Sequence, residues 1–119
     1  MGSRLGIVGT RRPFVGLTEK IRTILQTLEP DDVIVTGCAK GVDEAARTEG
    51  SLRGFVVIEC HAPWSIGRKA GPIRNSVIVD LLDPETDRLI AIVDSESIGT
   101  WDTIRKAKQK GIPVEILRV

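Results

Sequence analysis

Five short runs of apolar residues, rich in Val and Ile, recur along the chain with polar segments between them. Continuous runs of this length are typical of strands that are buried on both faces of a sheet. Their β-branched side chains favour strand over helix because they pack well on a pleated surface. The runs cover residues 5–8, 33–35, 55–58, 89–93 and 114–117.

Helical patterns separate these runs. The first pattern has apolar residues three or four positions apart, the spacing of a helix with one buried face: Ile21, Ile24, Leu25 and Leu28. Thr18 is expected to cap this helix, and Glu29 to end it because Pro30 follows. Three more helices are predicted over residues 42–52, around Pro72 near the start of its helix, and over residues 100–110.

Strands that alternate with helices predict an α/β fold with a parallel sheet covered on both faces. We expect residues 1–119 to form a single Rossmann-like three-layer domain whose five-stranded parallel sheet has the order 3-2-1-4-5. In such sheets ligands bind beyond the carboxyl ends of the strands, where the strand order reverses. That point lies between the first and the fourth strand.

Composition excludes several kinds of site and partner. Seventeen basic and sixteen acidic residues leave a net charge of +1, which, with only four aromatic residues, argues against nucleic acid as a partner. One histidine and two cysteines at unrelated spacing predict no metal site, and no cofactor is expected. No apolar stretch approaches the ~20 residues of a membrane span, so no membrane contact and a cytoplasmic location are expected.

Two loops after predicted strands carry groups suited to a phosphate. Gly9 allows close backbone approach, Thr10 supplies a hydroxyl, and Arg11 supplies a guanidinium. The second loop is a glycine-rich turn into a helix, which directs backbone N–H groups at an anion. Its candidate residues are Gly37, Lys40, Gly41 and Asp43. Asp43 is expected to cap the helix or to accept a hydrogen bond from a ribose hydroxyl.

Two further loops complete the predicted anion site. Arg74 and Asn75 are expected in the first turn of a helix, where a cation opposes the helix dipole and a bound anion would offset that cost. Gly99 and Thr100 offer backbone N–H groups and a hydroxyl at another helix start, with Thr100 as its N-cap. The loops together hold six cations, which favours a phosphate-bearing small molecule: Arg11, Arg12, Lys40, Arg68, Lys69 and Arg74.

Four motifs occur in order along the chain: Gly-Thr-Arg, Thr-Gly-x-Ala-x-Gly-x-Asp, Gly-Pro-Ile-Arg-Asn and Gly-Thr-x-Asp-Thr. In this combination the chain resembles the SLOG superfamily of Rossmann-like nucleotide-binding proteins. It looks most similar to the YspA-like, YpsA-related branch, with LOG phosphoribohydrolases, molybdenum-cofactor carrier proteins and DprA as more distant relatives. The resemblance implies a nucleotide or ribose-phosphate ligand bound by Gly9, Thr10, Arg11, Gly37, Gly41, Asp43, Arg74, Asn75, Gly99 and Thr100.

Three functions stay open on this reading. The first is a nucleotide-binding module that acts as a sensor or carrier. The alternative is a hydrolase of a nucleotide N-glycosidic bond, with Arg74 and either Asp102 or Asp43 as catalytic candidates. Thr103 stands where LOG enzymes carry a catalytic glutamate, which weakens that alternative. The third is DprA-like binding of single-stranded DNA.

Four other residues, Trp64, Trp101, Cys38 and His61, bear on partners and chemistry. A homodimer is also expected, with Trp64 and Trp101 either at its interface or as a wall on which a base stacks. Cys38 would be a nucleophile only if its surroundings lowered the thiol pKa, and a Cys–His pair with the sole histidine stays a minor alternative.

Overall fold

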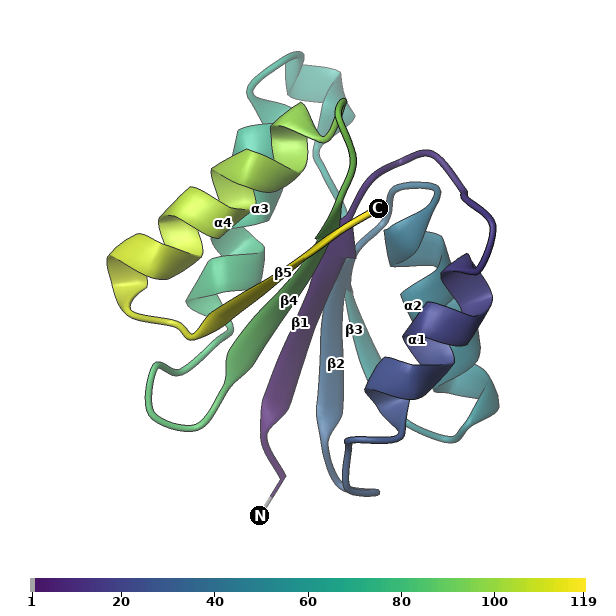
Figure 1. The fold of residues 1–119 in the computed structure, drawn as a ribbon. Helices are drawn as coiled ribbons and strands as arrows, with labels where there is room; N and C mark the ends of the chain where they lie inside the picture. The colour runs from purple at the N-terminus through teal and green to yellow at the C-terminus, as the bar shows by residue number, and fades with distance from the viewer. Residues whose placement is uncertain (1) are drawn as a thin grey trace.

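The computed structural model describes residues 2–119 and shows strands and helices in strict alternation (Figure 1). The strands are β1 (Arg4–Gly9), β2 (Val33–Gly37), β3 (Val56–Cys60), β4 (Arg88–Val93) and β5 (Val114–Arg118). The helices are α1 (Leu17–Leu25), α2 (Val42–Leu52), α3 (Ala70–Asp80) and α4 (Ile98–Lys110), and a short 3₁₀ helix covers Trp64–Ile66. The alternation predicted from the apolar runs is confirmed.

All neighbouring strands are parallel, and their order is β3-β2-β1-β4-β5, as predicted. Helices α1 and α2 cover one face of the sheet, and α3 and α4 cover the other (Figure 1). The chain leaves β1 toward the α1 face and leaves β4 toward the α4 face. Because β1 and β4 are neighbours, their connections diverge and open a crevice at the carboxyl edge of the sheet.

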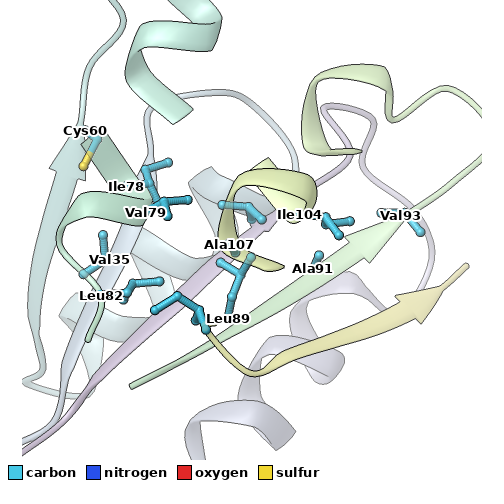
Figure 2. Close-up of a cluster of buried hydrophobic side chains, with 12 residues drawn as sticks. Val35, Cys60, Ile78, Val79, Leu82, Leu89, Ala91, Val93, Ile104 and Ala107 are labelled. Carbon is cyan, nitrogen blue, oxygen red and sulfur yellow. The ribbon is translucent and has the colours of Figure 1, made fainter. Parts of the chain in front are cut away.

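Strand β4 shows why the apolar runs are continuous. Leu89, Ala91 and Val93 belong to the core beneath α3 and α4, which Figure 2 shows from close by. Ile90 and Ile92, which alternate with them, belong to the core beneath α1 and α2. Both faces of the strand are therefore buried from Leu89 to Val93, and its one polar residue, Arg88, lies at its start.

Three helix boundaries, two on α1 and one on α4, differ from the sequence prediction. Helix α1 begins after Gly16 rather than at a Thr18 cap, and it ends at Leu25 rather than at Glu29. Beyond Leu25 the chain tightens, since Leu28 N–H donates to the Leu25 carbonyl at 3.1 Å, three residues back. Helix α4 begins at Ile98 after Ser97, so Thr100 lies within the helix and is not its N-cap.

The helices are short. None of those that the structure describes within residues 2–119 is long and apolar enough to cross a lipid bilayer.

Candidate functional site

A cavity of about 250 Å³ lies at the carboxyl edge of the sheet, in the crevice between β1 and β4. It is lined by side chains and backbone from all four loops that the sequence singled out. The sequence-predicted residues found in its wall are Gly9, Thr10, Arg11, Asp43, Arg74, Asn75, Gly99 and Thr100. Residues that are up to about ninety positions apart in the chain thus meet because parallel strands end at one edge.

The two glycines of the β2–α2 loop contribute by their lack of a side chain rather than by lining the cavity. Gly41 has φ +75°, and a Cβ atom there would meet the carbonyl oxygen of Thr10. At Gly37 a Cβ atom would lie 2.5 Å from Asp43 Oδ2 and 2.7 Å from Arg74 Nη1. Only glycine therefore lets this loop approach both the β1 loop and the charged groups.

Arg74 is a buried cation in the wall of the cavity. It is 8% exposed. The sequence predicts Arg74 in the first turn of α3, but it lies in the second turn. Its Nε donates to Asn75 Oδ1 at 3.0 Å. Within residues 2–119 it forms no salt bridge with a carboxylate, although charged side chains are normally paired when buried.

Asp43 is the acidic group of the cavity, and it is 5% exposed. It accepts hydrogen bonds from Thr36 Oγ1 at 3.1 Å and from Ala39 N–H at 3.3 Å. Burial raises its pKa from 3.8 to about 6, against the lowering effects of these bonds and of the Arg74 charge. Gly41 occupies the N-cap position of α2, so the capping role predicted for Asp43 is wrong.

A second carboxylate, Asp94 after β4, ties two loops together. It accepts a hydrogen bond from Thr10 Oγ1 at 2.7 Å and pairs with Arg12 at 3.2 Å. The Thr10 bond and the further donors around it hold the pKa of Asp94 well below its ordinary value. Arg12 also contacts Glu96 at 3.0 Å, so two carboxylates already neutralise this cation.

Asp102, one of the catalytic candidates, is not part of the cavity wall. Its carboxylate joins α3 to α4 by accepting from Asn75 Nδ2 at 3.1 Å and pairing with Lys106 at 2.8 Å. Burial acts to raise the pKa of Asp102, but the bonds from Lys106, Asn75 and Arg105 outweigh it and lower the pKa. The Asn75 amide also donates to the Gly99 carbonyl at 3.2 Å, which fixes the start of α4.

A second hollow of about 370 Å³ adjoins the cavity, and the two share Arg11, Ala39 and Arg74. Lys40 lines this hollow together with Trp64, whose ring lies 5.7 Å from the Arg11 guanidinium carbon. Trp64 is 57% exposed. The hollow thus offers an aromatic face and cations next to the buried arginine.

Some residues in the wall of the cavity were not predicted from the sequence. Ser97, Ile98 and Thr103 line it, but the sequence prediction places the start of α4 two residues late and does not count them among the ligand-binding residues. An N-cap read at Ser97 would have placed the start of the helix at Ile98, although the Ser97 hydroxyl bonds Asp94 and makes no cap hydrogen bond. Conversely, Arg68 and Lys69 are exposed and line neither hollow.

Comparisons with known proteins extend these observations. No family model matches the chain. The X-ray structure of DNA processing protein A (DprA) from Streptococcus pneumoniae aligns with a TM-score of 0.76 and 22% sequence identity, over 97% of this chain. The chain spans 50% of that DprA chain. The expected Rossmann-like, DprA-like fold is therefore confirmed.

One expectation about partners is overturned by this similarity. The near-neutral charge and scarce aromatic residues argued against nucleic acid, yet a DNA processing protein has the same fold. The net charge of +1 does not describe this edge of the sheet, because Arg11, Lys40 and Arg74 gather in one hollow there.

A relative in a bacteriophage is much closer in sequence. The Gene 61 protein of Mycobacterium phage D29 is 38% identical over 88 residues, which cover 69% of this chain and 68% of that protein. The chain belongs to the family of this phage protein.

Proposed function

We propose that the chain binds a nucleotide at the carboxyl edge of its sheet and acts as a sensor or carrier module. The observation that carries the proposal is Arg74, a cation that is 8% exposed, lines the cavity and has no carboxylate partner among residues 2–119. A phosphate would supply the missing counter-charge and accept bidentate hydrogen bonds from the guanidinium.

The start of α4 supports the same placement of the phosphate. Gly99 and Thr100 line the cavity in the first turn of the helix, where backbone N–H groups lack partners within the helix. The positive end of the helix dipole adds to the Arg74 charge. Asn75 holds this turn against α3, so the anion site is rigid before a ligand arrives.

Size and lining decide how the rest of the ligand would lie. The cavity of 250 Å³ is smaller than the ~300–1,000 Å³ of sites for drug-sized ligands, so it suits a phosphate and a sugar. Asp43 would accept a hydrogen bond from the ribose. The base would extend into the hollow of 370 Å³ and lie near Trp64.

A strand of nucleic acid is the second candidate ligand. It is favoured by the fold shared with a DNA processing protein and by the exposed ring of Trp64 beside Arg11 and Lys40. One nucleotide of a single strand would then occupy the same cavity, and its neighbours would follow the exposed cations.

Within the SLOG superfamily, we assign the chain to the YspA-like branch.

Hydrolysis of the N-glycosidic bond has less support from the geometry. Asp102 is held between α3 and α4 by Asn75, Lys106 and Arg105. Asp43 is the remaining candidate to activate a water. We therefore expect no free base when the protein is incubated with AMP, and release above background would favour the enzyme.

Calorimetry with AMP, ADP-ribose and a short oligothymidylate tests the proposal. The Arg74→Ala variant should lose measurable binding, because charge-assisted hydrogen bonds contribute about 1.5–3 kcal/mol each. Its melting temperature should stay near that of the wild type, because removing an unpaired buried charge offsets the loss of the bond to Asn75. Lys108→Ala, which removes one exposed charge from the far end of α4, is the matched control. Unchanged affinity in Arg74→Ala would contradict the proposal.

A further inference from the structure

Three side chains with metal-binding groups meet beside the two hollows. The ligand atoms of Cys38, Glu59 and His61 all lie within 4.8 Å of one another, and all three residues are exposed. Cys38 also lines the hollow that contains Trp64. None of the three lines the cavity of about 250 Å³ proposed for the phosphate, so the cluster lies outside that cavity.

The pairing of β2 with β3 produces this cluster. Gly37 is the register partner of Cys60, so Cys38 and His61 are the next positions along the two chains. Glu59 and His61 are two residues apart, which places their side chains on the same face of the extended chain. Metal-binding motifs are recognised in a sequence by closely spaced ligands, and Cys38 and His61 are too far apart to form one.

The donor set suits zinc. A thiolate, an imidazole nitrogen and a carboxylate oxygen are the three ligand types that Zn²⁺ takes in proteins. The thiolate and the carboxylate together carry two negative charges, which balance the charge of the ion. Tetrahedral bonds of about 2.0–2.3 Å put ligand atoms about 3.3–3.8 Å apart, so these exposed side chains need to close by at most about 1.5 Å.

Arg47 forms an ion pair with the Glu59 carboxylate. Its Nε lies 3.3 Å from Glu59 Oε1, and this contact leaves the second carboxylate oxygen for a metal ion. Partners of this kind orient ligating carboxylates in known metal sites. The nearby cations Arg11, Lys40 and Arg74 line the same hollow as Cys38 and oppose a second positive charge, so binding depends on both anionic ligands.

We propose that Cys38, Glu59 and His61 together bind one zinc-type divalent ion at the carboxyl ends of β2 and β3. Three protein ligands leave a fourth position for water or for an anionic group of a ligand, as in metal sites that exchange their ligands. The site does not depend on nucleotide binding, so either can be present without the other.

Cobalt spectroscopy tests the site on the full chain. The reduced, chelator-treated protein is titrated with Co²⁺, which in such a site gives a sulfur-to-cobalt charge-transfer band and tetrahedral d–d bands. We expect saturation at one equivalent and displacement by Zn²⁺. Cys38→Ser should abolish the charge-transfer band, and Glu59→Gln and His61→Gln should weaken Co²⁺ binding about tenfold or more.

Cys60→Ala is the matched control, because it removes the other thiol and keeps all three ligands. It should retain the full spectrum, and circular dichroism confirms that each variant is folded. The proposal is overturned if the wild type gives no charge-transfer band. It is equally overturned if the band survives Cys38→Ser, or if Cys60→Ala abolishes it.

Discussion

Arg74 and Asp43 are two buried opposite charges that lie near one another without forming a direct ion pair. Both approach Gly37, where a Cβ atom would lie within 2.7 Å of either side chain. The Arg74 guanidinium and the Asp43 carboxylate can therefore each form further hydrogen bonds with a bound ligand. The sequence predicts both residues for the site, but not this arrangement, because only the folded chain shows which charges find partners. Arg12 looked equally available, yet Asp94 and Glu96 neutralise it.

The raised pKa of Asp43 has a consequence for stability. Between pH about 4 and about 6 the folded state holds a proton that the unfolded state has lost, so the free energy of unfolding falls as pH rises. A shift of about two pKa units corresponds to about 3 kcal/mol. Asp43→Asn stays neutral, so it should gain up to this amount on the wild type between pH 4 and pH 7.

Urea unfolding of both proteins across this pH range measures the difference. Other carboxylates, Asp94 among them, titrate in both proteins and cancel. A wild-type-minus-variant difference that stays constant with pH would contradict the raised pKa.

At the scale of elements, the Asn75 amide links α3 to the first turn of α4, while Lys106 and Lys110 of α4 donate to carbonyls of α3. Asn75 accepts from Arg74 and donates both to the Gly99 carbonyl and to Asp102. The sequence marks Asn75 as a candidate ligand-binding residue, but it does not show that this amide links two helices. Hydrophobic periodicity predicts that the two helices exist, but not which polar side chain orients the second on the first.

Asn75→Ala should therefore destabilise the protein by about 1–3 kcal/mol, because it leaves buried hydrogen-bonding groups without partners. Denaturant unfolding gives the value. Ser76→Ala is the comparison, since the Ser76 hydroxyl donates only to a carbonyl of its own helix. Equal effects of the two substitutions would show that Asn75 does not join the helices.

The turn from β2 into α2 gives a second prediction at this scale. Gly41→Ala should cost about 2–3 kcal/mol, because a side chain there combines positive φ with a clash against Thr10. Gly54 has φ +82° with open space around it, so Gly54→Ala should cost only about 1 kcal/mol. The difference, measured by thermal unfolding, isolates the clash. Equal losses would mean that the two loops do not touch.

For the whole molecule, the strand order follows from the sequence because buried parallel strands leave few topologies. The distribution of charge over the surface does not follow, since it depends on which loops meet. The sequence suggests six cations at one edge, and Arg11, Lys40 and Arg74 line the two hollows. Three cations could contact the phosphates of a short stretch of nucleic-acid backbone, although the net charge of the chain is only +1.

If a single strand binds along these three cations, its affinity should fall with salt. Three phosphate contacts predict a slope of about −2 in a plot of log K against log salt concentration. Fluorescence anisotropy with labelled oligothymidylate measures it. Lys40→Ala should make the slope shallower, whereas Arg68→Ala should not change it. A slope near zero would exclude a strand held by its phosphates.

The fluorescence of Trp64 should report on the occupancy of the two hollows. The Arg11 guanidinium lies over its ring at the junction of the two hollows, and the ring itself is largely open to solvent. Any occupant that displaces Arg11 changes the electric field at the indole, and with it the colour of the emitted light. The other tryptophan, Trp101 in the first turn of α4, has Arg118 rather than Arg11 over its ring and supplies an internal reference.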